Sequence, residues 1–264
     1  MTTEPVIRLG VPALEMRGVS VDSPNDRNTQ VATGVNWTVN PGEFWVLGGA
    51  QRSGKTDFLM MAGGLTAPSA GNYRFFGLDM PISDDEQLVE RLKLGFVFDG
   101  GQLFNRLTVA ENVTLPLRYH RDLTRDAALA EVQALLEGLG LERTVKSRPA
   151  TLGRGFQQRV GLARALALQP EVLMLDTPLS GLDTQHTIWW LNMLNELWRG
   201  HTLMKGRPMT LVVTTDDLRP WQAEGRHFAC LSAERLLVLG GWNEVERCPD
   251  AAVHDLLRER HGGH

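Results

Sequence analysis

Nine consecutive residues of this chain have the types and spacing needed to hold phosphate groups. They are Gly49, Ala50, Gln51, Arg52, Ser53, Gly54, Lys55, Thr56 and Asp57, and the first eight fit the pattern G-x-x-x-x-G-K-[ST]. In such a loop, backbone N–H groups and a helix N-terminus point at the phosphates, the lysine reaches the β- and γ-oxygens, and the Thr56 hydroxyl ligates Mg²⁺. An ordinary strand–turn–helix corner with a surface lysine would also fit these positions. The interpretation therefore depends on what the remainder of the chain supplies.

A second stretch places a carboxylate at the end of a buried strand. Val172-Leu173-Met174-Leu175 is continuously apolar and is followed by Asp176, a pattern that predicts a strand covered on both faces. At the carboxyl end of such a strand, Asp176 would face the phosphate-binding loop and hold Mg²⁺ through water. Thr56 and Asp176 are therefore the predicted metal ligands.

The two stretches need a parallel sheet to bring them together, and the order of the predicted elements provides one. Strands are predicted at about 12–24, 31–39, 44–47, 72–76, 95–98, 172–175, 210–214, 228–231 and 235–239. Helices are predicted at about 58–62, 84–94, 124–139, 156–167, 184–198 and 250–260, and another begins at a capping box of Thr108 and Glu111. Strands that alternate with helices indicate a largely parallel, doubly covered sheet.

Composition sets modest limits on function. The chain has 264 residues, 42% hydrophobic and 22% charged, with a formal net charge of −4. These values are ordinary for a globular protein, and the charge gives no indication of a nucleic-acid-binding surface. No apolar run approaches the ~18 residues of a membrane span, and we expect no signal peptide. Two cysteines without metal-ligand spacing fit a reducing cytosol.

The segment upstream of the buried strand completes a spacing that few families share. Leu152, Gly153, Arg154, Gly155, Phe156 and Gln157 open an apolar-periodic stretch, and Ser180, Gly181, Leu182 and Asp183 follow the strand. With these residues in place, the chain resembles an ABC (ATP-binding cassette) nucleotide-binding domain over about residues 12–245. The resemblance makes Gly49–Thr56 the Walker A loop and Leu173–Asp176 the Walker B strand. It makes residues 152–157 the signature and residues 180–183 the D-loop. It implies ATP and Mg²⁺ as ligands.

The same resemblance implies a fold and its subdivision. The fold is an α/β P-loop NTPase cassette, with a RecA-like mixed sheet, an antiparallel β subdomain and an inserted helical subdomain. We expect one nucleotide-binding domain, with its core at about 12–83 and 165–245, the helical subdomain at about 84–164 and a tail at about 246–264.

A finer resemblance lies at residues 95–121. Gly95-Phe96-Val97-Phe98-Asp99 and the later Asn112-Val113 and Leu115-Pro116-Leu117-Arg118 are similar to the ATPase subunits of Mla-type phospholipid transporters. That likeness implies a membrane permease that docks near 98–118, a second cassette as a homo- or heterodimer, and an Mce-domain lipid-binding protein as a further partner. It also implies a location at the cytoplasmic face of the inner (plasma) membrane. The pattern occurs in other importers and exporters too.

Three positions depart from the family where catalysis takes place. Thr177 stands where the family has the Glu that positions or polarises the attacking water, and it cannot act as a carboxylate base. Thr215 replaces the switch His and lacks the reach of imidazole to a γ-phosphate. Asp99 aligns with the Q-loop Gln and adds negative charge close to the polyphosphate. No catalytic residue of the family is therefore intact.

Five further departures concern binding. Gly153 removes a signature hydroxyl, and Arg154 replaces a glycine whose close backbone approach a side chain obstructs, although a guanidinium can itself bind phosphate. Within the Walker A loop, Arg52 stands at a usual Gly and Asp57 at a usual Ser or Thr. Val21 stands where an adenine-stacking aromatic ring is expected. So many changes at separate contact points indicate a degenerate cassette.

Two classes of function follow. The first is an ATP-binding subunit of a membrane transporter with weak or absent hydrolysis, for which the Mla-type resemblance implies a lipid cargo. The second is a non-catalytic pseudo-ATPase, a structural or regulatory subunit of a membrane complex. ABC proteins of translation or DNA repair are a weaker third option, because they generally carry tandem cassettes, coiled coils or zinc modules.

Overall fold

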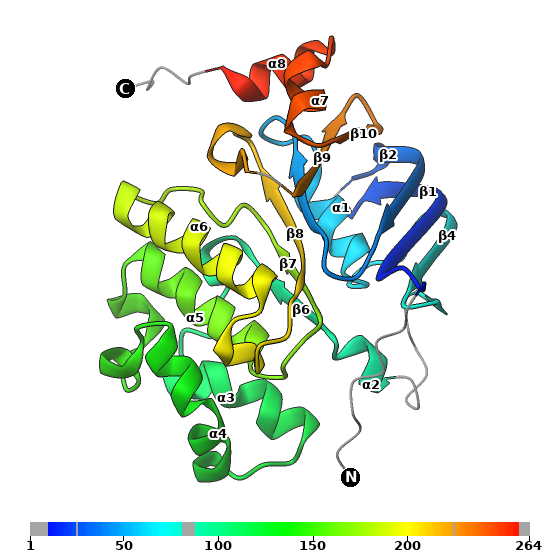
Figure 1. Cartoon of the computed structure of the whole chain (residues 1–264). Coiled ribbons are helices and arrows are strands. Elements are labelled where there is room, and N and C mark those ends of the chain that lie inside the picture. The colour runs from blue at the N-terminus through cyan, green and yellow to red at the C-terminus, as the bar shows by residue number, and fades with distance from the viewer. Residues whose placement is uncertain (1–9, 25, 81–87, 224, 259–264) are drawn as a thin grey trace.

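The strands of the chain form two sheets, shown in the computed structural model of Figure 1, which describes residues 10–24, 26–80, 88–223 and 225–258. One sheet is six-stranded and mostly parallel, and the other is four-stranded and antiparallel. The mixed architecture and the antiparallel β subdomain predicted by the family resemblance are both confirmed.

The six-stranded sheet positions the functional loops. Its order is β10-β9-β3-β8-β7-β6, with β3 at Phe44–Gly48, β6 at Leu94–Val97, β7 at Val172–Leu175, β8 at Thr210–Thr215, β9 at Arg226–Ser232 and β10 at Arg235–Gly240. All neighbours pair in parallel except β10 and β9. Every residue of β3, β7 and β8 is buried, as expected for strands of a parallel sheet that is covered on both faces. The carboxyl ends of β3, β7 and β8 therefore meet at one edge.

The antiparallel sheet has the order β2-β1-β4-β5, with β1 at Leu14–Ser23, β2 at Asp26–Val39, β4 at Ala70–Phe75 and β5 at Leu78–Asp79. Helix α1 (Lys55–Ala62) contributes Phe58, Leu59 and Met61 to a core cluster that includes residues of both sheets. In Figure 1 this helix lies beside β1 and β2. The phosphate-binding loop, which precedes α1, is thus anchored by both sheets.

The helical part packs on the other face of the six-stranded sheet. It contains α3 (Val109–His120), α4 (Arg125–Gly138), α5 (Arg154–Leu166) and α6 (Thr184–Arg199). The capping box predicted at Thr108 and Glu111 is confirmed, because both of its hydrogen bonds are present. Strand β6 lies within the range 84–164 yet pairs with β7 in the sheet, so the bundle of helices begins after it. Of the helix predicted at 84–94, the described part is α2 (Leu88–Arg91), and residues 81–87 lie outside the described residues.

Two short helices end the chain. They are α7 (Trp242–Arg247) and α8 (Ala251–Leu257), and residues 259–264 of the predicted tail fall outside the described part. Helix α8 packs beneath the site, because Leu218 N–H donates to the Leu256 carbonyl oxygen at 3.1 Å. No helix in the described ranges has the length and apolar character that crossing a bilayer requires.

Candidate nucleotide site

The predicted phosphate-binding loop connects the buried strand β3 to helix α1. Gly54, the N-cap of that helix, has a left-handed φ of 84° and makes no side-chain cap hydrogen bond, so the first backbone N–H groups of the helix point toward the loop. The Lys55 ammonium is buried inside the loop, where Nζ donates to the carbonyl oxygens of Gly49 at 2.8 Å and Ala50 at 2.6 Å. Hydrogen-bonding groups and a cation therefore converge at the start of α1, the arrangement expected of a phosphate cradle.

One residue of the loop is conformationally unusual. Arg52 has φ 61°, the left-handed region that glycine occupies without a steric penalty. The neighbouring Gly54 is tightly packed, because a Cβ built on it would lie 2.6 Å from Cγ1 of Val31. The loop thus keeps the backbone path of a glycine-rich turn while carrying a long cationic side chain.

The two predicted metal ligands are brought together. Thr56 Oγ1 donates to Asp176 Oδ2 at 2.8 Å, and Thr214 Oγ1 donates to Asp176 Oδ1 at 2.8 Å. The Asp176 side chain comes from the end of β7 and is buried. A hydroxyl and a carboxylate side by side fit a hard cation that takes its other ligands from water and phosphate oxygens, as Mg²⁺ does. No group of three or more His, Cys, Asp or Glu side chains suited to a metal occurs among the described residues.

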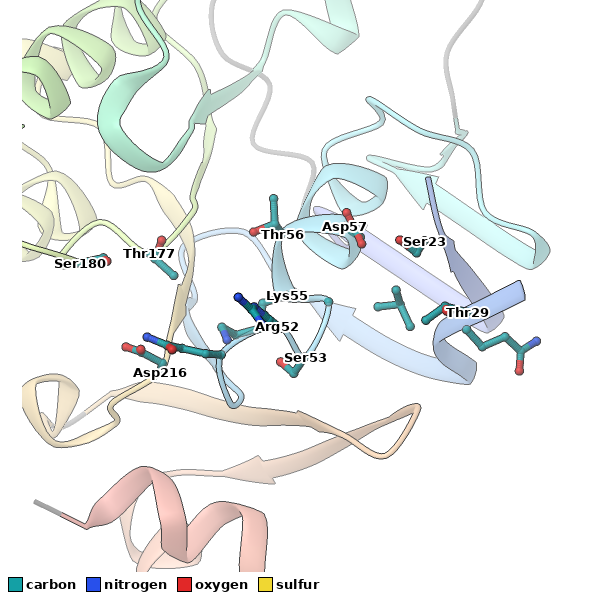
Figure 2. A pocket seen from close by; sticks show the side chains of 14 residues that line it. Ser23, Thr29, Arg52, Ser53, Lys55, Thr56, Asp57, Thr177, Ser180 and Asp216 are labelled. Carbon is teal, nitrogen blue, oxygen red and sulfur yellow. The ribbon is translucent and has the colours of Figure 1, made fainter. Parts of the chain in front are cut away.

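A cavity of about 490 Å³ opens beside these residues (Figure 2). Its lining comes from both sheets and consists of Ser23, Thr29, Gln30, Val31, Gln51, Arg52, Ser53, Gly54, Lys55, Thr56, Asp57, Thr177, Ser180 and Asp216. Figure 2 shows Ser23 and Thr29 on one side of the loop, and Thr177, Ser180 and Asp216 on the other. The cavity is large enough for a small-molecule ligand of nucleotide size.

The charges in this cavity are mixed. Two cations, Arg52 and Lys55, share the lining with the carboxylates of Asp57 and Asp216. Burial raises the pKa of Asp57, a hydrogen bond with Ser23 opposes that rise, and the nearby charge of Asp176 adds to it. The cavity is therefore less favourable to a bare polyphosphate than the lysine and the helix terminus alone would make it.

Two residues that the family resemblance places at catalytic positions, Thr177 and Thr215, make hydrogen bonds within the chain. Thr177 lines the cavity with φ 42°, an outlier for a β-branched residue, and its N–H donates to Thr214 Oγ1 at 2.9 Å. Thr215 is buried, and its hydroxyl donates to the Asp217 carbonyl oxygen at 2.8 Å while accepting from Asp217 N–H at 3.1 Å. The side chain of Thr215 is thus used within its own turn, and the following residue, Asp216, reaches the cavity instead.

The signature residues gather at the N-terminus of α5. Gly153 is the N-cap, Gly155 is so close to His186 that a Cβ would lie 2.1 Å from its ring, and Phe156 makes an edge contact with that ring. Gln157 Nε2 donates to the carbonyl oxygens of Pro149 and Leu152. Among the described residues that line the cavity, none belongs to 152–157. The residues that the resemblance assigns to the signature therefore lie together at the start of α5, outside the lining of this chain's own cavity.

Arg154 and Asp99, both unexpected by family pattern, face each other. The Arg154 guanidinium forms an ion pair with the Asp99 carboxylate, and its Nε donates to the Ser180 carbonyl oxygen at 2.9 Å. Of the D-loop residues, Ser180 lines the cavity, Gly181 has φ 68°, and Leu182 packs against the core. Asp183 caps α6, and hydrogen bonds from His186 lower its pKa.

The residue of β1 that lines the cavity differs from the expected one. Val21 is buried in the core cluster, and Ser23 is the residue of β1 that lines the cavity. Register shifts in β1 between Val21 and Asp22 and between Asp22 and Ser23 redirect the end of the strand. Sequence reasoning also missed Thr29, Gln30 and Asp216 as lining residues. The only signal for them was that their segments border a turn or a strand end.

Comparison with known proteins gives the family. The profile of the family described as "ABC transporter" matches residues 32–180, more than half of the chain. The Macrolide export ATP-binding/permease protein MacB of Azoarcus sp. (strain BH72) is 34% identical over 199 residues, which cover 74% of this chain and 30% of that protein. MacB of Escherichia coli (strain K12) is 34% identical over 217 residues, or 81% of this chain and 32% of that protein. The chain thus spans about a third of the length of these curated relatives.

Solved structures of ABC cassettes resemble this chain. The ATP-binding cassette MJ0796, a dimer bound to ADP and Pi in a post-hydrolysis state, is similar with a TM-score of 0.74 and 28% identity, covering 87% of this chain and 100% of that one. The cbiO1 protein of Clostridium perfringens, part of the ABC transporter complex cbiONQ, has a TM-score of 0.74 at 23% identity over 90% of this chain and 92% of that one, a likeness in fold alone. On the strength of the family profile and the geometry of its loop and strands, this chain belongs to the ABC transporter family.

Proposed function

We propose that the chain binds ATP with Mg²⁺ in the 490 Å³ cavity and is the ATP-binding part of a membrane transporter that hydrolyses ATP weakly or not at all. The observation that carries this proposal is the cluster of Lys55, Thr56 and Asp176 at the carboxyl edge of the sheet. In the proposed complex, Lys55 and the N-terminus of α1 bind the phosphates, and Thr56 and Asp176 hold the cation. Mg²⁺, when bound, neutralises part of the phosphate charge.

Weak hydrolysis is argued from the side chains at the catalytic positions. Thr177 carries no carboxylate, and the Thr215 hydroxyl is used by the backbone of Asp217. A general base and a charge-stabilising group each contribute about 10²–10⁴ to a rate. We therefore expect turnover below about a hundredth of that of a competent cassette.

The transport role rests on the family and on an exposed surface beyond the Asp99 turn. Phe104 is 56% exposed, while its backbone is fixed by the buried Asn112, whose Oδ1 accepts from Phe104 N–H at 2.9 Å and whose Nδ2 donates to the Phe104 carbonyl oxygen. An exposed aromatic side chain on a hydrogen-bonded backbone suits a partner surface. We propose a permease as that partner, with a second cassette completing the assembly.

Two classes of cargo are proposed, macrolides and lipids. The relatives MacB of Azoarcus sp. and of Escherichia coli are named for macrolide export, which supports an exporter. The pattern at 95–121 resembles Mla-type systems, which favours a lipid cargo and an Mce-domain partner. Purification of the native complex, with identification of the copurifying permease and cargo, separates these two possibilities.

A second candidate function is a pseudo-ATPase that holds a membrane complex together. The observations that favour it are the carboxylates of Asp57 and Asp216 in the cavity lining, since negative charge there opposes ATP binding. The subdivision into a core, a helical part and a tail is a proposal under either function.

Titration of the purified chain with labelled ATP, with Mg²⁺ and with EDTA, tests the proposal. We expect saturable binding that requires Mg²⁺ and is lost in both Lys55→Ala and Thr56→Ala. Steady-state hydrolysis is measured on the same samples. Turnover on the order of one per second, typical of working enzymes, would contradict weak hydrolysis if Lys55→Ala abolished it. Absence of binding in a folded wild-type chain would favour the pseudo-ATPase.

A further inference from the structure

The side chain of Arg154 joins three segments that are distant in sequence. Arg154 is the first residue of α5, Asp99 begins the short 3₁₀ turn η2 (Asp99–Gly101) after β6, and Ser180 lies in the D-loop after β7. The guanidinium pairs with the Asp99 carboxylate, and Nε donates to the Ser180 carbonyl oxygen at 2.9 Å. One planar group thus satisfies an acceptor on each of two loops, a geometry that arginine provides and lysine does not.

The guanidinium lies against two glycines. A Cβ built on Gly100 (φ 65°) would be 3.4 Å from Arg154 Nη1, and one built on Gly181 (φ 68°) would be 3.0 Å from Nε. A side chain at Gly181 would crowd the guanidinium. Both loops therefore have backbone shapes that accommodate this particular side chain.

The opposite charges of Arg154 and Asp99 stabilise each other at this position. A cation in the first turn of α5 opposes the helix dipole, and the Gly153 N-cap offers no side chain to the free N–H groups. The carboxylate of Asp99 next to Arg154 offsets that cost. In turn, burial raises the pKa of Asp99 and Asp176 raises it further, while Arg154 lowers it. Each residue offsets the unfavourable electrostatics of the other.

A second contact holds the same turn from further along α5. Arg164 donates to the carbonyl oxygens of Gly101 at 2.7 Å and Gln102 at 3.0 Å. Arg154 and Arg164 are ten residues apart in α5, or about 15 Å along a helix axis. The turn after β6 is thus clamped near both ends of α5, and Arg154 is the clamp that also reaches the D-loop.

We propose that Arg154 is a positioning residue that locks the signature segment of this chain to its own Asp99 turn and D-loop. The guanidinium is thereby used within the chain instead of being offered to a phosphate bound by a neighbouring cassette. Because the lock consists only of residues of this chain, the inference does not depend on ATP binding and goes beyond the proposed function.

Amide hydrogen exchange of the full chain, measured without nucleotide, tests the lock. In Arg154→Ala we expect exchange about tenfold faster in residues 98–102, 153–157 and 178–183, since an exposed ion pair is worth up to about fivefold in an equilibrium constant and the Ser180 bond adds to it. Arg121→Ala is the matched control. It removes the Arg121–Glu131 pair at 2.5 Å, whose side chains are 42% and 41% exposed, against 41% and 44% for Arg154 and Asp99. The control should leave all three segments unchanged.

A double-mutant cycle separates the lock from a simple surface ion pair. Asp99→Asn and Arg154→Ala should each accelerate exchange in the D-loop, and the double variant should exchange no faster than Arg154→Ala alone. Arg154→Lys, which keeps the charge and serves as a milder change if the alanine variant unfolds, should restore protection only partly. Additive effects in the cycle, unchanged D-loop exchange in Arg154→Ala, or full protection in Arg154→Lys would each overturn the proposal.

Discussion

At the residue scale, the site combines groups that attract a polyphosphate with groups that oppose it. Lys55 and the Thr56–Asp176 pair have the geometry of a nucleotide site. Arg52, Asp57 and Thr177 occupy the same cavity with a strained backbone or an unfavourable charge. Because each of these three can be changed alone, the residue scale is where the opposing contributions can be measured.

Arg52 gives the first prediction, on stability. A non-glycine residue at φ 61° costs about 1–2 kcal/mol relative to a relaxed conformation. Arg52→Gly should therefore raise the free energy of unfolding by about 1 kcal/mol, because the greater freedom of glycine in the unfolded chain reduces part of the gain. Arg52→Ala removes the guanidinium but keeps the strain, so its stability should stay near that of the wild type. Urea unfolding of the three proteins measures the difference, and equal gains in both variants would contradict the strain argument.

Asp57 gives a prediction that depends on pH. Its pKa is raised in the folded chain, first by burial and then by Asp176, so the folded state loses stability as pH rises through that pKa and this carboxyl ionises. In the Asp57→Asn variant the side-chain amide does not ionise in this pH range. The variant should be more stable than the wild type at pH 7, and the difference should vanish as pH falls to the ordinary carboxyl value of 3.8. Urea unfolding at a series of pH values checks the sign, and a difference that is constant with pH would contradict it.

The same substitution should tighten binding of Mg-ATP. Removal of a unit negative charge from the cavity is worth about 1 kcal/mol, or a factor of about five in Kd. Isothermal titration at pH 7 measures the change. An unchanged Kd would indicate that the Asp57 carboxylate is fully screened.

At the scale of elements, α5 and the turn after β6 approach each other closely enough for backbone to contact backbone. A Cβ built on Gly161 would lie 2.8 Å from the Gly101 Cα, and one built on Gly101 would lie 2.5 Å from the Gln157 carbonyl oxygen. Backbone therefore meets backbone where the helical part joins the sheet. Movement of α5 must carry the Asp99 turn with it.

Two glycine-to-alanine changes test this packing. Gly161→Ala should destabilise the chain by about 1–3 kcal/mol, since a backbone atom cannot move aside as a side chain can, even though alanine favours a helix by up to ~1 kcal/mol. Gly138→Ala, near the end of α4, meets only side-chain atoms of Leu203, the nearest at 2.9 Å, and should be close to neutral. Thermal unfolding compares the two. Equal stability of the two variants would show that the turn after β6 can shift away from α5 to make room for the added methyl group.

At the scale of the whole molecule, the cavity joins the two sheets. Thr29 and Gln30 come from β2 of the antiparallel sheet, whereas Thr177 and Asp216 follow strands of the six-stranded sheet. A ligand that contacts both walls should stabilise the chain as one unit.

Thermal unfolding with Mg-ATP measures that stabilisation. At a ligand concentration 100 times the Kd, the free energy of unfolding should rise by about 2.7 kcal/mol, which corresponds to about 5–10 °C in Tm for a chain of this size. The shift should be absent in Lys55→Ala and with EDTA. A shift that persists in Lys55→Ala would place the nucleotide elsewhere.

Much of the fold, and the local structure of the candidate site, could be predicted from the sequence. The Walker A loop, the Thr108 capping box and the Asp176 strand end are each defined by residues adjacent in the chain. Local pattern therefore determines them, because helix caps, apolar runs and glycine turns act over a few residues. The largely parallel sheet followed from the alternation of elements.

The tertiary structure alone decided the pairings across the fold. The Arg154–Asp99 contact joins residues 55 apart in sequence, and no local pattern relates the two. The register shifts of β1 put Ser23 in the cavity and Val21 in the core, an outcome that strict strand alternation would not give, since both residues share one face under a period of two. The sequence by itself thus determined the loop at residues 49–56 and the buried strand that ends before Asp176. The charges that surround this loop, and the pairing of Arg154 with Asp99, depend on which loops the packed sheets bring together.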